Sequence, residues 1–244
     1  MIAFVPARSG STRIPGKNVR LLAGHPLLAY SIRSAIDSGI FSAVYLATDS
    51  EQYAEIGTKY GATWWRRQPS PANEPDFEWV KGVVETGAEY FAILRPTSPF
   101  RTAATIRRAW DEWVVENATG KSRPDSLRAV SPAKTNPYKM WWYSSHENRI
   151  TPVMHDCEWG FPPAPLGQPL HSVATQTLPP AWAQNASLEI ARTDVVTRYG
   201  NISGREVMPF FSQGFEGYDL NTEDEWSYAE WLVETGRAKL PEVK

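Results

Sequence analysis

A run of small, hydroxylated and basic residues near the amino end of the chain has the composition of an anion-binding loop. It spans residues 7–18, reads ARSGSTRIPGKN, and follows the apolar run 2–6 directly. Gly10 and Gly16 allow positive backbone dihedrals and a close approach of main-chain N–H groups to a ligand. Hydroxyl groups add further donors, and Arg8, Arg13 and Lys17 add three positive charges. This combination predicts a concave site for a triphosphate.

The spacing of this loop excludes two familiar nucleotide-binding motifs. The Walker loop requires GxxxxGK followed by Ser or Thr. Here Gly10 and Gly16 lie one residue further apart, and Asn18 follows Lys17. The GxGxxG pattern of dinucleotide-binding folds is not matched either. A basic surface turn is the alternative interpretation of the loop.

The first half of the chain has the pattern of an α/β fold. Apolar runs of strand length lie at 2–6, 43–47, 62–65 and 90–94. Helical spacing is found between them, at 27–36, 51–60 with Ser50 as its cap, 76–88 and 103–116. This alternation predicts a mainly parallel sheet covered by helices on both faces. The loop would then lie at the carboxyl end of the first strand, where open α/β sheets bind ligands.

The pattern changes after about residue 130. Residues 140–143 and 149–153 are expected to pair as a hairpin, and 161–180 are rich in proline without periodicity. Strands at 187–191 and 207–211 and a helix at 224–234 follow. A long irregular stretch within a compact domain is typical of a lid, an arm or an interface. We therefore predict a single domain over 1–244 with an inserted dimerisation arm at about 132–183.

The bulk composition restricts the class of protein. The 244 residues are 42% hydrophobic and 21% charged, as in a globular protein, and the formal net charge is -2. This balance argues against a broad nucleic-acid-binding surface. The single cysteine, Cys157, excludes an intramolecular disulfide. No signal peptide and no apolar stretch of about 20 residues is found, so we expect a cytoplasmic protein without a membrane partner.

Three blocks of sequence resemble one family in its own order along the chain. They are IAFVPARSGSTRIPGKNVRLLAGHPLLAYSI, FAILRPTSPFRTAATIRRAW and GYDLNTEDEWSYAEWL. They are similar to the amino-terminal block, the LLQPTSPLR segment and the IDIDTxxD segment of the CMP-N-acetylneuraminate synthetases, the acylneuraminate cytidylyltransferases. The resemblance implies a Rossmann-like nucleotidyltransferase fold and a homodimer whose arms reach the partner's sugar pocket. It also implies Mg²⁺-dependent transfer of CMP from CTP to the anomeric hydroxyl of a sialic-acid-like 2-keto-3-deoxy sugar acid, with release of pyrophosphate.

The resemblance further implies roles for residues of the nucleotide half. Arg8, Lys17 and Asp219 would be catalytic. The nucleotide would be bound by Ala7, Arg8, Ser9, Gly10, Ser11, Arg13, Lys17, Asn18, Arg67 and Asn73. Asp219 and Asn221 match the family's paired aspartates and would hold the metal. Asn221 offers only a neutral oxygen, so Glu223 or Asp224 is an alternative source of charge; both also suit the start of a helix.

The acceptor half departs from the family pattern. By resemblance, the sugar acid would be bound by Arg95, Thr97, Ser98, Arg101, Lys139, Gln176 and Asn185. Arg95 replaces a glutamine of the family and is suited to bind a carboxylate or another anionic substituent. The alternative for Arg95 is a structural salt bridge, and for Arg101 an internal pair with Asp or Glu. Ala183 stands where the family's FRPNG-like segment has arginine, which points to altered sugar recognition.

Two other functions stay open from the sequence. GSTRIPGK also resembles loops of octulosonate cytidylyltransferases and of spore-coat polysaccharide proteins, so a related nucleotidyltransferase with another acceptor is possible. A function of a different class is a catalytically weak protein that binds nucleotide or sugar. Asn221 and the altered acceptor segment motivate this second alternative.

Overall fold

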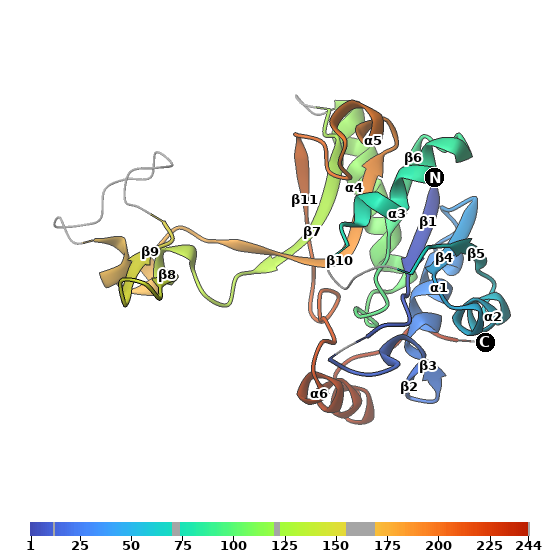
Figure 1. The fold of residues 1–244 in the computed structure, drawn as a ribbon, viewed down its shortest axis with the longest axis horizontal. Helices are drawn as coiled ribbons and strands as arrows, with labels where there is room; N and C mark the ends of the chain where they lie inside the picture. The colour runs from blue at the N-terminus through green and yellow to red at the C-terminus, as the bar shows by residue number, and fades with distance from the viewer. Residues whose placement is uncertain (12, 70–73, 120–122, 155–168, 244) are drawn as a thin grey trace. The chain divides into compact units, whose positions relative to one another are not determined.

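The computed structural model describes residues 1–11, 13–69, 74–119, 123–154 and 169–243. The chain divides into two compact units (Figure 1). The first combines Met1–Val130 with Gln184–Lys244, and the second is Ser131–Ala183. None of the helices in these described ranges is both long and apolar enough to cross a bilayer.

The first unit is built on a mainly parallel sheet, as predicted. Within the described residues the order of its seven strands is β11-β7-β10-β6-β1-β4-β5. Strand β1 pairs in parallel with β4 and β6, β4 with β5, and β11 with β7, whereas β10 runs antiparallel to β6. The bounds are β1 Ile2–Pro6, β4 Ala43–Thr48, β5 Thr63–Arg66, β6 Tyr90–Ile93, β7 Ser126–Pro132, β10 Trp182–Arg192 and β11 Val207–Phe211.

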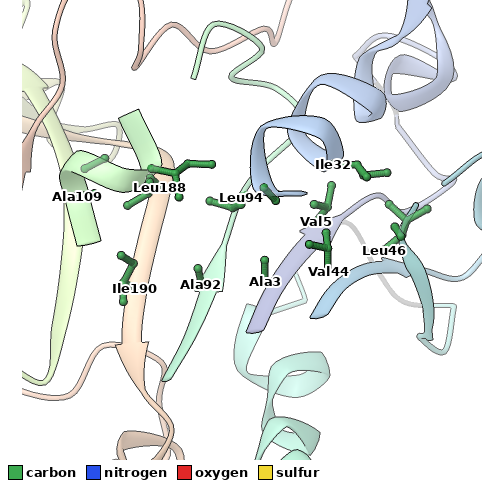
Figure 2. Packing of buried hydrophobic residues seen from close by; sticks show 14 of the residues in the cluster. Ala3, Val5, Ile32, Val44, Leu46, Ala92, Leu94, Ala109, Leu188 and Ile190 are labelled. Carbon is green, nitrogen blue, oxygen red and sulfur yellow. The ribbon is translucent and has the colours of Figure 1, made fainter. Parts of the chain in front are cut away.

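Alternate residues of the central strands point to opposite faces of the sheet, and helices cover both faces. Ala3 and Val5 of β1 face α1 (Leu27–Ser38) and α4 (Ala103–Thr119), as Figure 2 shows for part of this cluster. Ile2 and Phe4 face the other side, where α3 (Asp76–Val80), the 3₁₀ helix η2 (Lys81–Thr86) and α5 (Asp194–Tyr199) pack. The sheet is therefore covered by a buried apolar layer on each face.

Several local elements agree with the sequence and others differ from it. Helix α2 (Glu51–Lys59) begins as predicted, since the Ser50 side chain accepts a hydrogen bond from the Tyr53 N–H. The predicted helix 76–88 is instead α3 followed by η2. Strand β7 and helix α5 were not predicted. Strand β7 carries the buried Arg128 between apolar neighbours, so its hydrophobic pattern is broken by an ion-pair partner.

A third apolar cluster joins the amino-terminal loop to the last helix, α6 (Glu223–Glu234). It buries Ile14 against Trp226 and Leu232, together with Leu220. Thr222 and Glu225 form a capping box at the start of α6. The 3₁₀ helix η1 (Lys17–Val19) and the short strands β2 (Leu21–Leu22) and β3 (His25–Pro26) complete this end of the unit. Residues from opposite ends of the sequence are thus held together.

The second unit contains an antiparallel hairpin, β8 (Trp141–Ser144) and β9 (Arg149–Pro152). Among the residues of this unit that the structure describes, three 3₁₀ turns accompany it: η3 (Pro137–Lys139), η5 (Leu170–Ser172) and η6 (Thr175–Thr177). Its small core consists of Tyr138, Leu170 and Leu178. The hairpin was predicted, with strands at 140–143 and 149–153.

Candidate active site

A cavity of about 290 Å³ lies where loops following β1, β5 and β6 meet the segment before α6. Five of its lining side chains are cationic and three are acidic, which leaves a net positive site suited to an anion. The position matches the carboxyl-end rule for open α/β sheets. The lining residues are Pro6, Arg8, Ser11, Arg13, Ile14, Lys17, Asn18, Arg67, Glu74, Asp76, Arg95, Pro96, Thr97, Asp219 and Asn221.

The loop after β1 is anchored at both of its ends. The Ser9 N–H and hydroxyl both donate to the Asp49 carboxylate, at 2.8 and 3.1 Å. Asn18 donates from Nδ2 to the Arg8 carbonyl at 3.2 Å and so closes the loop on itself. Gly16 has the predicted positive φ, 64°, but Gly10 does not adopt the left-handed region. Neither Ser9 nor Gly10 lines the cavity, and Ala7 is buried beneath it with its N–H bonded to the Ala47 carbonyl.

Two cations of the loop contact the segment before α6. Lys17 donates from Nζ to the Leu220 carbonyl at 2.7 Å and to Asn221 Oδ1 at 3.3 Å. Arg13 donates to the same Asn221 oxygen at 2.9 Å. Burial lowers the pKa of Lys17, and the nearby Asp219 carboxylate offsets this only in part. The loop and residues 219–221 therefore form one electrostatic unit.

Asp219 carries the oxygen best suited to a metal ion. Its Oδ1 is buried without a hydrogen-bond partner among the described residues, while Oδ2 accepts from Asn221 Nδ2. A buried carboxylate oxygen without a partner is costly unless a cation binds it. Magnesium suits such a site, because it keeps several waters and takes one or two carboxylates beside substrate phosphates. No cluster of three or more His, Cys, Asp or Glu is found in the described ranges, so a denser protein cage is not available there.

Asn221 does not present a free oxygen beside Asp219. Its amide oxygen faces two cations, and the opposite orientation of the amide would direct its N–H groups at them. Electrostatics therefore fix the amide with its nitrogen toward Asp219. Of the alternative acids, Glu223 pairs with Arg20 at 2.7 Å, and Asp224 is exposed; neither lines the cavity.

The segment after β5 contributes a charged pair, Arg67 and Glu74, to the cavity wall. Arg67 pairs with Glu74 at 2.7 Å, and its guanidinium lies 4.9 Å from the centre of the Trp79 ring. These contacts hold the buried Arg67 in the cavity wall, and the family resemblance implied nucleotide recognition for this residue. Asn73, predicted to act with Arg67, lies outside the described residues.

Arg95 is an ion-pair centre in this structure. It contacts the carboxylate of Asp76 and that of Glu189, the second at 3.0 Å. Glu189 is buried and also pairs with Arg128. The structural alternative considered for Arg95, a salt bridge, is therefore what the structure contains, although Arg95 also lines the cavity.

The remaining residues of the RPTSPFR segment hold neighbouring backbone. The Thr97 carbonyl accepts from the Leu220 N–H at 2.8 Å and so ties this segment to Asp219. Ser98 is buried and does not line the cavity. Arg101 is 1% exposed and donates to the Ser187 and Arg95 carbonyls and to the Ser31 hydroxyl. Its contacts are thus with neutral oxygens, rather than with the Asp or Glu considered from the sequence, and it does not line the cavity.

Replacement of Arg101 by Met is expected to act on stability rather than on substrate binding. The change would leave buried carbonyl and hydroxyl groups without their donor. The free energy of unfolding should fall by about 3 kcal/mol, as measured by urea denaturation. Arg107→Met, on the exposed side of α4, is the matched control. An unfolding free energy equal to that of the control variant would contradict this structural role.

Besides Ser98 and Arg101, three further predicted acceptor residues are not among those that line the cavity. Lys139 and Gln176 belong to the second unit. Lys139 donates to the His171 and Val173 carbonyls at 2.7 and 2.5 Å, and Gln176 is exposed in η6. Asn185, in β10, donates to the Ser212 hydroxyl at 2.8 Å.

Sequence reasoning missed two acids that line the cavity, Glu74 and Asp76, and the buried Glu189 that pairs with Arg95. Asp76 was visible only as the first residue of a predicted helix, and Glu189 as the polar position in a predicted strand. A charged residue at an inward position of a buried strand is the signal that could have indicated an ion pair. Its partner, Arg95, was already under consideration as a reader of anions.

Comparison with known proteins agrees with this geometry. Residues 2–100 match a family model described as cytidylyltransferase. The chain is 29% identical to CMP-N,N'-diacetyllegionaminic acid synthase of Legionella pneumophila, over 98% of this chain and 99% of that protein. It is 42% identical to N-acylneuraminate cytidylyltransferase of Escherichia coli, over 45% of this chain and 27% of that protein.

A solved structure shows the same fold at low sequence identity. CMP:2-keto-3-deoxy-manno-octonic acid synthetase complexed with CTP superposes with a TM-score of 0.65 at 12% identity, and the match covers 96% of this chain and 98% of the other. The likeness shows a Rossmann-like nucleotidyltransferase fold. Residues 2–100 thus carry the match to cytidylyltransferases, and the chain is similar over almost its whole length to the CMP-N,N'-diacetyllegionaminic acid synthase.

Proposed function

We propose that this protein transfers CMP from CTP to the anomeric hydroxyl of a nonulosonic acid, the class that includes sialic, legionaminic and pseudaminic acids, and releases pyrophosphate. One observation carries the proposal. A single cavity brings the cations Arg8, Arg13 and Lys17 together with Asp219, whose Oδ1 has no hydrogen-bond partner among the described residues. The names of the relatives supply the acceptor class. A cytoplasmic setting is proposed with it, because CTP is supplied there.

The reaction would require little covalent participation by the protein. The acceptor hydroxyl releases its proton to water, and its oxygen attacks the α-phosphorus as the bond from that phosphorus to the β-phosphate oxygen breaks. The pyrophosphate carries the electron pair away. Arg13 and Lys17 would keep their bonds to Asn221 and direct their remaining N–H groups at phosphate oxygens. They would neutralise the charge that develops on the departing pyrophosphate, and Arg8 and Ser11 would complete the cradle. Positioning and charge stabilisation would thus supply most of the rate.

Asp219 is the residue proposed to hold a magnesium ion, through Oδ1. When bound, the ion would neutralise charge on the triphosphate oxygens. Because the Asn221 oxygen faces Arg13 and Lys17, we propose Asp219 as the one side-chain metal ligand of this pair. Asn221 would instead position the two cations.

A screen of pyrophosphate release tests the proposed function. CTP, UTP, ATP and GTP are each combined with a panel of nonulosonic acids and with the shorter octulosonic acid, with and without Mg²⁺. Turnover should require CTP, Mg²⁺ and a nonulosonic acid. Turnover with the octulosonic acid but with none of the nonulosonic acids would show that the acceptor belongs to another class of sugar acid. Tight CTP binding without turnover on any sugar acid would instead favour a binding protein, the alternative that the Asn221 amide supports.

The second unit is proposed to form a homodimer contact. Its hairpin exposes several large apolar side chains, and Trp142 is 66% exposed. Exposed clusters of this kind are typical of protein interfaces. The exposed residues are Met140, Trp141, Trp142, Tyr143 and Ile150.

Trp142→Ser is expected to shift the protein from dimer toward monomer, because the substitution removes a large aromatic contact from the proposed interface. Light scattering coupled to size-exclusion chromatography over a range of concentrations measures the change. Tyr228→Ser, at an exposed aromatic of α6 in the first unit, is the control. A monomeric wild type, or a Trp142→Ser protein as dimeric as the control, would refute this contact.

A further inference from the structure

Four charged side chains form a connected group at one wall of the cavity. Arg95 contacts Asp76 and Glu189, and Glu189 also pairs with Arg128. Glu189 and Arg128 are buried, whereas Arg95 and Asp76 line the cavity. Two guanidinium groups and two carboxylates are present, so their formal charges cancel. This wall therefore differs from the loop side of the cavity, where cations predominate.

Arg95 is poorly placed to read an anionic substituent of a substrate. Its charge is already balanced by Asp76 and by the buried Glu189, so a substrate anion would compete with two internal carboxylates for the guanidinium. Removal of one partner from a buried ion pair is strongly unfavourable, because it leaves an uncompensated charge. Arg95 is thus suited to hold the two carboxylates in place. The side chain that it holds toward the cavity is Asp76.

Asp76 keeps capacity to accept further hydrogen bonds. Its Oδ1 accepts from Trp79 Nε1 at 3.0 Å, and the carboxylate accepts from Arg95, yet an ionised carboxylate has about four lone-pair sites. The side chain is 24% exposed, on the cavity side. Burial alone would raise the pKa of Asp76, but the hydrogen bond and charge of Arg95 more than offset this and keep the pKa below its usual value. Asp76 is therefore an acceptor without a proton to donate at neutral pH.

We propose that Asp76, positioned by Arg95, is a specificity-determining residue that accepts a hydrogen bond from an N–H or O–H group of a bound substrate. A substrate with an anionic group, or with only a hydrogen-bond acceptor, at the position facing Asp76 would be disfavoured. This inference rests on the proposed function. The donor comes from one of two sources. Cytosine carries an exocyclic amino group, which carboxylates recognise, whereas uracil presents an oxygen at that position. The sugar acid carries hydroxyl and amide N–H groups.

Asp76→Asn tests the inference, because it keeps the size of the side chain and removes its charge. Binding of CTP and of UTP without acceptor is measured by calorimetry, and KM and kcat are measured with the acceptor found by the pyrophosphate screen. If the donor is cytosine, CTP should bind about tenfold more weakly and the preference for CTP over UTP should shrink. If the donor is on the sugar acid, CTP binding should stay constant and the acceptor KM should rise about tenfold, with kcat changed less. Unchanged values in both assays would overturn the proposal.

Two further variants separate recognition from folding. Glu78→Gln lies on the same helix in an exposed pair with Lys81 and is the matched control. Arg95→Gln should change the same parameter as Asp76→Asn, and Arg95→Lys should restore it in part. A folded Arg95→Gln protein with wild-type binding and KM would overturn the positioning role. The calorimetric comparison of CTP with UTP needs no turnover, so a cytosine contact can be tested even if every sugar acid fails as a substrate.

Discussion

Lys17→Met is expected to reduce kcat by about 10²–10³-fold, while the protein stays folded. Lys17 lies 8% exposed at the base of the loop, with its ammonium directed at residues 220 and 221. Met keeps the apolar stem but removes the charge that would stabilise the departing pyrophosphate. Pyrophosphate release at saturating CTP measures the loss.

Two further variants distinguish the loss of the Lys17 ammonium group from a general effect of lost positive charge. Lys59→Met, at an exposed position near the end of α2, should retain full activity. Lys17→Arg keeps the charge but changes its reach, so an intermediate activity is expected. Full activity of the Lys17→Met protein would show that the loop is not part of the catalytic site.

Asp219→Asn is the second substitution with a large expected effect. It exchanges a carboxylate for an amide at a residue that lines the cavity and whose buried Oδ1 has no hydrogen-bond partner among the described residues. Turnover should fall by about 10²–10³-fold, and the Mg²⁺ concentration needed for half-maximal activity should rise. Binding of Mn²⁺ in the presence of CTP, followed by electron paramagnetic resonance, provides a readout independent of turnover.

Asp224→Asn is the matched control for Asp219→Asn, because Asp224 is an exposed acid at the start of α6. It should leave both Mn²⁺ binding and activity unchanged. If Asp219→Asn bound Mn²⁺ as tightly as the wild type in the ternary mixture, the proposed metal ligand would be wrong.

The features that depend on local order were predictable from sequence. The run 2–6, the loop beside it and the cap at Ser50 follow from hydrophobic period and residue type, which act over a few positions. Strand β7 could not be found in this way. Arg128 interrupts its apolar pattern, and distant residues accommodate it: Glu189 in β10 balances its charge, and the Ile202 carbonyl and Ser203 hydroxyl accept its hydrogen bonds.

The roles of residues in the acceptor half of the site could not be predicted, because they depend on contacts between residues that lie far apart in the sequence. Arg95 has the same side chain whether it binds a substrate carboxylate or two internal acids, and only the fold brings Asp76 and Glu189 to it. Arg101 likewise has a side chain that is typical of anion binding, but in the fold its guanidinium donates to two backbone carbonyls. Asn221 was recognised as an unusual residue at a metal position. Its contacts with Arg13 and Lys17, which suggest a different role, required the structure.

The contacts of Lys17 with Leu220 and Asn221 join residues separated by about 200 positions in the chain. During synthesis the loop emerges long before its partners, because translation proceeds from the amino end at about 5–20 residues per second. The phosphate cradle therefore cannot adopt its final geometry on a nascent chain that stops before residue 219, even where neighbouring strands have already paired. Nucleotide binding to a nascent chain would thus require synthesis at least as far as residue 221.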